Sequence, residues 1–570
     1  MKITFVHSPE DYYDQNYGTQ FVPLWAYYLA AYVPSQWDIE IVDCRLEEIN
    51  RCGPADIFAF SGINQDLGAM TQTMEKLKKR FPKATYLLGG PITWSFEKEG
   101  KLKLLGAFDY LFILDGETSL PEFLGHYENG THHKLDRILR APRHPLLKAK
   151  KIRFDLMDQK KHSYYGAVVE ASRGCPFLCE FCDIRVLPGN NQTNAKDIGL
   201  FIEEMDECYK RGITKFQIAC DNFIGDTQWA IACCDALLEW KNRTGANVSL
   251  FTWLTINIYK MPKLMTKMRQ IGFSILFIGI ESVNRNSLLE TAKVQNMNAL
   301  EEAVMTLYSY GFIIAPGLIF GFDSDTENVF QETLDFLVET GTIGGDPSFL
   351  MALAGTPLYA RMKKSGRLIE RKDVAIERKK VTTNILYLQD REFLVSGFLK
   401  FVKDFSRPSY QYRRFKKNVE LMVDSPNFIP IKTGGYASPL PYLKSQIGNA
   451  KNMSMMFQRI FYLLRPDCFW VVCKAGYLAA KNSRKAPGLF TNFFYWLYVW
   501  TNMVLKYKGF TPQDFDLNSV GSDFDRAQLA AAGIPSAAER DESLKEGVKI
   551  DVQQRYTQQA LQQLVNNEIR

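Results

Sequence analysis

Residues 172–189 read SRGCPFLCEFCDIRVLPG and place three cysteines, Cys175, Cys179 and Cys182, at spacings of four and three residues. Structural zinc normally takes four protein ligands in two pairs, and no second cysteine or histidine pair follows this stretch at finger spacing. A [4Fe-4S] cluster has four irons to ligate, so a loop with three thiolates leaves one iron open to a small molecule. The stretch therefore predicts a reactive iron-sulfur cluster rather than a structural metal site.

The composition indicates a multidomain globular protein. The chain has 570 residues, 46% of them hydrophobic, and at about 100 to 200 residues per domain it should hold about three domains. Eleven cysteines are too dilute for a disulfide scaffold and the N-terminus lacks the pattern of a secretory leader, so we expect a reducing, cytoplasmic setting. The net charge of +6 is small, and basic residues are scattered among acidic ones, which argues against a nucleic-acid partner.

Hydrophobic periodicity predicts an α/β protein with a helical C-terminal part. Residues 1–135 alternate short β-branched runs with helical patterns, which is typical of a doubly wound, Rossmann-like parallel sheet. We interpret residues 136–165 as a linker and residues 166–360 as a second parallel β/α domain of about six units. Residues 361–510 read as a helical domain, in which strand signals nearly vanish, and residues 511–570 as a polar helical tail.

The cysteine motif carries a family resemblance. The spacing Cys-x3-Cys-x2-Cys, with Phe181 before the third cysteine and the strand pattern GAVVEAS before the loop, resembles that of the radical S-adenosylmethionine (SAM) enzymes. The resemblance implies a partial (β/α)6 barrel, a [4Fe-4S] cluster whose open iron is chelated by SAM, and an external electron donor such as flavodoxin or ferredoxin. It also implies cleavage of SAM to a 5'-deoxyadenosyl radical. A non-catalytic iron-sulfur sensor is the alternative from a different class of protein.

The same resemblance implies where SAM would be bound. The backbone of Phe181 would meet the adenine edge. Later strand ends supply the other candidates: Asp221 and Asn222 for the amino group, Glu281 and Ser282 for the ribose, and Gly317, Ile319 and Gly321 near the adenine.

Two positions depart from the family pattern. In GLIFGFDSD the acidic residue, Asp325, comes one place late. At the end of the second barrel strand the related enzymes have an aspartate where this chain has Cys220. Two interpretations of Cys220 stay open, a buried spectator or a catalytic thiol that faces the substrate.

The front domain resembles cobalamin-binding domains. A serine in SGI precedes a glycine pair in LLGGPITW by 25 residues or so, as in domains where the serine reaches the nucleotide tail of cobalamin and the glycines let the backbone lie against it. The sequence ILDGETSLPEF resembles the last strand and helix of that domain, near the corrin edge. The candidate cobalamin-binding residues are Ser61, Gly89, Gly90, Gly116 and Glu117.

The motif Asp-x-His-x-x-Gly, which supplies the lower axial histidine to cobalt, does not occur in the chain. His7 has the wrong spacing for that role, and we interpret it as a strand-end residue. If cobalamin binds, we therefore expect cobalt without a histidine from this motif. A front domain that has lost its cofactor, or that binds only a partner, is the alternative.

Together these resemblances point to cobalamin-dependent radical SAM enzymes, with C-terminal pieces similar to the hopanoid C-2 methylase group. They imply methyl transfer from methylcobalamin to an unactivated carbon, with cobalamin-assisted cyclisation, oxidation or rearrangement as the alternative. Methylthiotransferases are excluded because their front domain carries three cysteines, whereas this one has only Cys44 and Cys52. The chain has no histidine after His162, so the barrel lacks the commonest general base, which hydrogen abstraction does not need.

The aromatic segment LFTNFFYWLYVWTNMVL at residues 489–505 has two interpretations. The segment carries two asparagines and two threonines, so it is a poor candidate for a membrane-spanning helix. It is either a buried helix of the C-terminal domain or a helix that contacts lipid at a membrane surface. The second interpretation predicts an apolar, lipid-like substrate and peripheral membrane contact. We expect a monomer.

Overall fold

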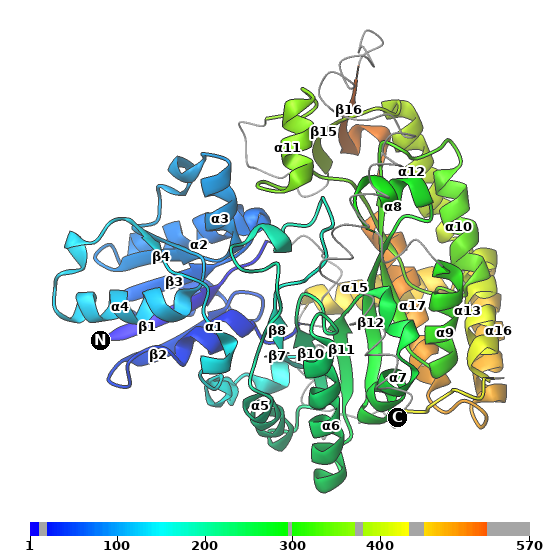
Figure 1. Cartoon of the computed structure of the whole chain (residues 1–570), viewed down its shortest axis with the longest axis horizontal. Helices are drawn as coiled ribbons and strands as arrows, with labels where there is room; N and C mark the ends of the chain where they lie inside the picture. The colour runs from blue at the N-terminus through cyan, green and yellow to red at the C-terminus, as the bar shows by residue number, and fades with distance from the viewer. Residues whose placement is uncertain (11–19, 294–298, 371–379, 424, 432–449, 521–570) are drawn as a thin grey trace.

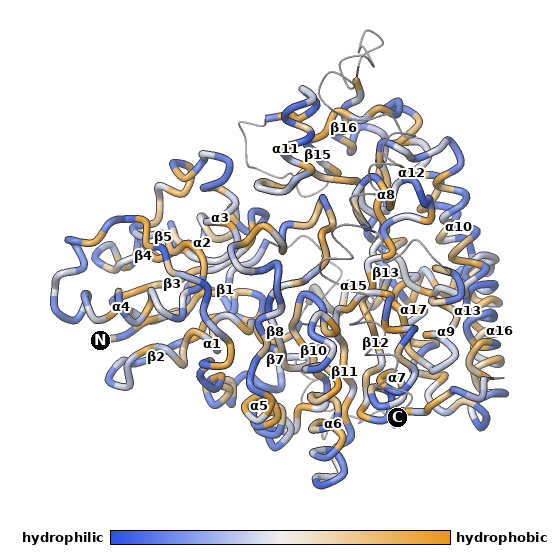
Figure 2. The backbone as a smooth tube through the Cα atoms, in the orientation of Figure 1, coloured by the Kyte–Doolittle hydropathy of each residue, from blue (hydrophilic) through white to orange (hydrophobic). Residues whose placement is uncertain are grey.

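The computed structural model describes residues 1–10, 20–293, 299–370, 380–423, 425–431 and 450–520. A front α/β domain, blue to cyan in Figure 1, lies beside a central parallel sheet drawn in cyan to green, and the C-terminal helices lie on the side away from the front domain. Along the surrounding helices, hydrophobic and hydrophilic residues alternate, as Figure 2 shows, which is the pattern of amphipathic helices.

The front domain is a parallel sheet in the order β2-β1-β3-β4-β5-β6. Ile57 and Ala59 face one apolar core, which includes residues of α1 and α4, while Phe58 and Phe60 face a second core with residues of α2 and α3. Helices therefore cover both faces, and the predicted doubly wound sheet is confirmed. Its elements are β1 (Lys2–His7), α1 (Leu24–Ala30), β2 (Asp38–Asp43), β3 (Ile57–Ser61), α2 (Leu67–Arg80), β4 (Thr85–Gly89), α3 (Pro91–Lys98), β5 (Tyr110–Ile113), α4 (Gly116–Glu128) and β6 (Ile138–Arg140).

The front sheet extends past the boundary that the sequence suggested. Strand β6 pairs in parallel with β5, so residues 138–140 belong to the sheet and not to a linker that begins at residue 136. The strand has only three residues and its pattern is weakly apolar, so its pairing depends on the neighbouring strand. The linker proper follows it.

The central domain is a second parallel sheet, in the order β7-β10-β11-β12-β13-β14, and β7 and β14 are its edges. This is the open six-stranded barrel that the family resemblance implied, with a helix after most strands. A short antiparallel pair, β8 (Ser172–Arg173) with β9 (Asn194–Ala195), brackets the cysteine loop. The main elements are β7 (Ala167–Glu170), α5 (Ile198–Lys210), β10 (Lys215–Ala219), α6 (Thr227–Thr244), β11 (Ser249–Trp253), α7 (Pro262–Ile271), β12 (Phe273–Glu281), α8 (Arg285–Glu290), α9 (Leu300–Tyr310), β13 (Ile313–Phe320), α10 (Val329–Glu339) and β14 (Asp346–Phe349).

The C-terminal part is mainly helical, as predicted, and it packs on the barrel. Its helices are α11 (Pro357–Lys364), α12 (Arg391–Phe405), α13 (Pro408–Val423), α15 (Ala450–Leu463), α16 (Pro466–Asn482) and α17 (Leu489–Lys506). Helices α15, α16 and α17 pack against one another, and α13 packs against α16 and α17.

Two strands in this part were not expected. Strand β15 (Val381–Tyr387) pairs in parallel with β16 (Phe515–Ser519), which lies in the region interpreted as a helical tail. Phe515 and Leu517 are buried, so this part of the tail is firmly docked. The two strands are separated by more than 120 residues, and local periodicity carries no signal for such a pairing. Residues 521–570 of the predicted tail lie outside the described residues.

The aromatic segment forms α17, and one of its faces is core. Trp496 and Trp500 are completely buried. The Trp496 indole donates to Gln411 Oε1 at 2.8 Å, and the Trp500 indole donates to the Ser406 carbonyl oxygen at 2.9 Å. Phe494, in contrast, is exposed. Among the helices that the structure describes, none is both long enough and apolar enough to cross a membrane.

Candidate active site

The three motif cysteines lie on one loop between β7 and α5. Cys179 is buried, and Cys175 and Cys182 are partly buried. Burial, with a smaller contribution from the neighbouring Cys179, raises the pKa of Cys175 to about 11. Burial and the carboxylate of Asp183 raise the pKa of Cys182 to about 12. As free thiols these groups would stay protonated, so thiolates here need a cationic partner such as iron.

The donor set fits a cluster better than a single ion. Among the described residues, no group of three His, Cys, Asp or Glu side chains is arranged to hold one metal ion. A [4Fe-4S] cluster does not require that arrangement, because each cysteine binds a different iron. The three thiols lie close enough on one loop for each to affect the pKa of a neighbour, and this closeness suits a shared cluster.

The barrel holds the start of the cysteine loop. The Gly174 N–H donates to Asp221 Oδ2 at 2.6 Å, and Asn222 Nδ2 lies 3.9 Å from Cys175 Sγ. Gly174 has φ +91°, and a Cβ at this position would lie 2.2 Å from the Gln192 carbonyl oxygen, so only glycine fits. In the structure, Asp221 and Asn222 thus support the loop beside the first cysteine.

The C-terminal part holds the middle of the same loop through Glu180. The Glu180 carboxylate accepts two hydrogen bonds from Arg361 of α11, from Nε and Nη2, both at 2.8 Å. The Glu180 carbonyl accepts from the Leu358 N–H at 3.2 Å. Arg361 also donates to Asp323 Oδ2 at 3.0 Å, and Arg367 binds Asp323 at 2.7 Å. We call this set, Glu180, Arg361, Asp323 and Arg367, the loop clamp.

Inside the barrel, Glu281 pairs with Lys293. The two side chains are nearly buried, and Lys293 Nζ lies 2.7 Å from Glu281 Oε1. Burial disfavours the charge of Lys293, but the Glu281 carboxylate and the nearby thiol of Cys179 raise its pKa above the usual value. A Cβ at Gly279 would lie 2.1 Å from Glu281 Oε1, so this glycine makes room for the pair. The structure therefore brings the predicted ribose residue close to the cysteine loop.

Phe181 and Gly317 belong to the same region. Lys293 Nζ lies 5.9 Å from the centre of the Phe181 ring. A Cβ at Gly317 would lie 3.6 Å from Glu281 Oε2 and 3.3 Å from the Phe277 ring, so the missing side chain leaves space above the strand. Phe181, Glu281 and Gly317 are thus gathered around the thiols, and Lys293, which sequence reasoning missed, completes the group.

Other predicted SAM residues shape the turns behind this group. Ser282 is buried, and its hydroxyl accepts from the Asn284 N–H at 3.0 Å. The Gly321 N–H donates to Asp325 Oδ2 at 2.8 Å, and burial raises the pKa of Asp325 to about 6. Ile319 is half-buried on β13 and packs against the core. The late acidic residue of GLIFGFDSD therefore closes the turn after β13.

Cys220 faces its own sheet. Its sulfur lies 3.2 Å from Thr252 Oγ1 and 3.4 Å from the Trp253 carbonyl oxygen, both on β11. Burial raises the pKa of Cys220 to about 12, so the thiol is protonated at neutral pH. This geometry favours the spectator interpretation over a nucleophilic thiol.

In the front domain, the predicted residues meet at the carboxyl ends of the strands. Ser61 of β3 lies directly opposite Gly89 of β4. Gly90 has φ +88°, and a Cβ there would lie 2.6 Å from Ser61 Oγ. Gly116 begins α4, where a Cβ would press on Leu29 at 3.2 Å. These glycines therefore let the strand ends and the start of α4 pack closely, and Gly90 and Gly116 also line the cavity at this edge.

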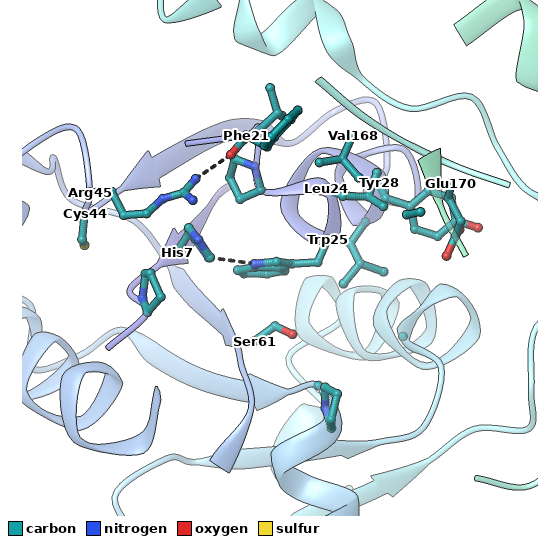
Figure 3. Close-up of a pocket in the computed structure, with 18 of the residues that line it drawn as sticks. His7, Phe21, Leu24, Trp25, Tyr28, Cys44, Arg45, Ser61, Val168 and Glu170 are labelled. Carbon is teal, nitrogen blue, oxygen red and sulfur yellow. Dashed lines mark hydrogen bonds between the residues drawn. The ribbon is translucent and has the colours of Figure 1, made fainter. Parts of the chain in front are cut away.

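A cavity of about 1660 Å³ opens from this edge toward the barrel. Its front-domain lining includes His7, Ser61 and Gly116, and its barrel lining includes Glu170 and Asp221. Figure 3 shows this cavity, with the end of β1 and helix α1 from the front domain and Val168 and Glu170 from β7. Drug-sized pockets have about 300 to 1,000 Å³, so this one has room for a much larger cofactor.

His7 ends β1, as predicted, and lies in this cavity. The Trp25 indole donates to His7 Nδ1 at 3.2 Å, a bond drawn in Figure 3. An indole can only donate, so Nδ1 accepts and the neutral ring carries its proton on Nε2. Burial lowers the pKa of His7 to about 4, against a smaller opposing effect of Asp43. In this tautomer neither ring nitrogen offers a free lone pair to a metal.

Arg173 connects the two domains just before the cysteine loop. Its guanidinium lies 3.3 Å from Asp115 and 2.7 Å from Glu117 of the front domain, and 2.8 Å from Glu170 of β7. Glu117, predicted to lie near a corrin edge, is buried and paired in this cluster. Neither Arg173 nor Arg361 was identified from the sequence, since a lone arginine has no spacing signal. A charged residue inside the cysteine motif, Glu180, was the available hint.

Comparison with known proteins locates this site in a family. Residues 169–337 match the radical SAM superfamily, and residues 356–462 match a domain of unknown function, DUF4070. The chain is 30% identical over 359 residues to hopanoid C-2 methylase of Rhodopseudomonas palustris. The aligned region covers 60% of this chain and 64% of the relative, so the chain spans less than two thirds of that relative's length.

Solved structures share the fold. OxsB, a cobalamin-dependent SAM radical enzyme solved with aqua-cobalamin and SAM, has a TM-score of 0.57 at 14% identity, over 93% of this chain and 83% of that one. The radical SAM methyltransferase TsrM of Kitasatospora setae, solved with cobalamin and a [4Fe-4S] cluster, has a TM-score of 0.50 at 11% identity, over 65% of this chain and 79% of that one.

Proposed function

We propose that the chain, whose residues 169–337 match the radical SAM superfamily, is a cobalamin-dependent methyltransferase acting on an unactivated carbon of a small molecule. Hopanoid C-2 methylase among the relatives supports methyl transfer. Its name gives a hopanoid as the substrate, which supports an apolar substrate here. The electron donor would be an external protein such as flavodoxin or ferredoxin.

One observation carries the proposal: the cysteine loop and the front-domain cavity share a wall. Asp221 lines the cavity, and its carboxylate also accepts the N–H of Gly174, the residue before Cys175. Arg173, two residues before Cys175, lines the same cavity. A ligand on the front domain and a cluster on the loop would therefore lie on two sides of one short segment, with the substrate able to meet both.

The residues present fit each cofactor. Cys175, Cys179 and Cys182 would hold three irons of a [4Fe-4S] cluster. Phe181, Glu281 and the space over Gly317 would bind SAM. When bound, the cluster and SAM supply a radical that abstracts a hydrogen atom. The chain's own residues hold the loop, through Asp221 and the loop clamp, and exclude bulk water by burial.

The cavity fits cobalamin by its size and by its position at the carboxyl ends of the front-domain strands, where Ser61, Gly90 and Gly116 line it. Ser61, Gly89 and Gly90 would lie along the nucleotide tail, and Gly116 near the corrin. When bound, methylcobalamin supplies a methyl group. His7 lies in the cavity as a neutral side chain that accepts from Trp25, so we propose that it packs beside the corrin and does not ligate cobalt.

The test is reconstitution under anaerobic conditions with iron, sulfide and hydroxocobalamin. We expect about one corrin per chain, with a spectrum that lacks histidine coordination, and reductant-dependent release of 5'-deoxyadenosine from SAM. Comparison of metabolites with and without the gene should identify the substrate, and the product should gain one CH2. A product that instead loses hydrogens would refute methyl transfer, and turnover without corrin would refute the cofactor assignment of the front domain.

A matched pair of variants tests the shared wall. Asp221→Ala should lower both iron content and corrin content, because this carboxylate supports the loop and lines the cavity. Asp235→Ala, on the exposed side of α6 in the same domain, should change neither. If Asp221→Ala keeps both cofactors at wild-type levels, the two sites are not coupled as we propose.

A further inference from the structure

The C-terminal helices expose an unusual amount of apolar surface. Ten of the fourteen exposed large hydrophobic side chains in the described residues lie between residues 456 and 494, and the other four are scattered singly over the front domain and linker. Single exposed hydrophobic residues are normal, whereas a concentration of this kind marks an interaction site. No substrate or cofactor contact in the site above uses these side chains.

The exposed residues follow helical periodicity. On α15 they include Phe457 and Phe461, with Leu464 directly after the last residue of the helix, and on α16 they include Trp470 and Tyr477. These spacings keep each set on one side of its helix. Phe490 and Phe494 of α17 repeat the pattern. Because the three helices pack against one another, these stripes belong to one bundle. We call this set of outward faces the apolar face.

The segment of the chain that carries the apolar face is rich in basic residues. Between residues 450 and 508 the sequence has nine lysines and arginines and one acidic residue, Asp467, although the whole chain has a net charge of only +6. Lys481, Arg484 and Lys485, at the turn between α16 and α17, are exposed and form no ion pair with the described part of the chain. Helix α16 lies at the end of the molecule away from the front domain (Figure 1), and none of the exposed side chains of the apolar face lines the cavity.

We propose that the apolar face docks the protein on an anionic membrane surface, with its aromatic side chains in the interfacial region and its basic residues against lipid headgroups. Aromatic and aliphatic residues on one side of amphipathic helices, with lysine and arginine beside them, are the pattern of interfacial helices. None of the described helices can span a bilayer, so contact from one side is the geometry that this surface allows. The inference goes beyond the proposed function, because it concerns a different surface and does not depend on methyl transfer.

The charge argues against other occupants. A second copy of the chain would bring the exposed basic residues of this bundle, among them Lys481, Arg484 and Lys485, toward the same residues across a symmetric interface, and like charges in contact disfavour that arrangement. Nucleic acid would suit the charge and the aromatic rings, but the aliphatic side chains of Met456, Ile460 and Leu464 lie among those rings and match hydrocarbon rather than bases. Hydrocarbon and anionic headgroups match both features.

The test measures co-sedimentation of the full-length holoenzyme with phosphatidylcholine vesicles, with and without phosphatidylglycerol. We expect binding to the anionic vesicles that weakens as salt rises. The double variant Phe461→Ser/Trp470→Ser should lose binding by at least about tenfold, because each ring buries a large apolar area in the interface. Since both residues are more than 60% exposed, the melting temperature should stay near that of the wild type.

Two controls separate the apolar and electrostatic contributions. Leu147→Ser removes an isolated, 73% exposed leucine and should leave binding unchanged. Lys481→Glu/Arg484→Glu/Lys485→Glu should weaken binding to anionic vesicles by about fivefold or more per residue, while the same charge reversal at Lys79, Lys83 and Lys103 of the front domain should not.

Each outcome decides the proposal. Cleavage of SAM in lipid-free solution should be unchanged in all these variants, so failure of docking is distinguishable from failure of the proposed chemistry. The proposal is overturned if the full-length chain ignores vesicles of both compositions, as it would if another segment of the chain covered the face. It is equally overturned if Phe461→Ser/Trp470→Ser binds vesicles like the wild type. The same holds if the variant keeps vesicle binding but converts a dimeric protein to a monomer, or if the only binding it loses is that to single-stranded RNA.

Discussion

Removal of Arg361 should loosen the cysteine loop from a distance of 181 residues along the chain. Arg361→Met keeps much of the side chain's volume but leaves the Glu180 carboxylate without either of its two 2.8 Å hydrogen bonds. Both side chains are about 15% exposed, so the pair is mostly buried. Breaking a buried pair by removing one partner costs about 3 to 5 kcal/mol, and partial exposure places this one near 3 kcal/mol.

The assay should report on the loop, because a multidomain chain has no single unfolding free energy. We expect iron to pass from the reconstituted protein to a chelator about 100-fold faster in Arg361→Met, since about 3 kcal/mol of local opening free energy corresponds to that factor. Glu180→Gln/Arg361→Met should recover part of the loss, because no buried carboxylate is then left unpaired. The coupling between the two changes should be about 2 kcal/mol.

The control is Arg153→Met. Arg153 also forms two hydrogen bonds of 2.8 Å to a carboxylate, that of Asp155, but both side chains are at least 40% exposed. Exposed pairs contribute about 0 to 1 kcal/mol, so iron release should change by a few-fold at most. Equal iron-release rates in Arg361→Met and the wild type would refute the argument that the C-terminal part stabilises the cluster loop.

Three further predictions follow from the described contacts. Cys179→Ala should lose a cluster ligand and abolish 5'-deoxyadenosine formation, whereas Cys233→Ala, buried in α6, should keep it, and full activity of Cys179→Ala would disprove the ligand assignment. The folded pKa of His7, about 4, lies below the unfolded value of 6.5, so the unfolded state binds the proton first as the pH falls. In corrin-free protein the unfolding transition of the front domain should therefore lose about 2 kcal/mol between pH 7 and pH 5, and His7→Gln should flatten that slope in denaturant titrations. Trp496→Ser should cost about 3 to 5 kcal/mol, seen as a large drop in melting temperature, while exposed Phe494→Ser should stay within about 0.5 kcal/mol; equal effects would contradict the buried placement of one face of α17.

The sequence alone determined the features that depend on local pattern. Three cysteines at short spacing predicted the cluster, and alternating strand and helix periods predicted two parallel sheets and a helical C-terminal part, because both signals are contained within a few turns or strands. Ser61 at the end of β3 and the glycine pair Gly89 and Gly90 at the end of β4 were identified by their resemblance to a short motif of cobalamin-binding domains, and the structure brings them together because parallel neighbours end at one edge. Fold class, family and candidate cofactors all came from such local signals.

Tertiary structure alone decided the contacts that join distant parts of the chain. Arg361 reaches Glu180, and Lys293 reaches Glu281, through packing that no spacing rule specifies. Strand β16 pairs with β15 across more than 120 residues, and the two faces of α17 differ because α13 covers one and leaves Phe494 outside. A charged or aromatic residue has the same local signal whether it is paired, buried or exposed. Its partner is set by the whole fold, which brings distant segments together only after their local structures have formed.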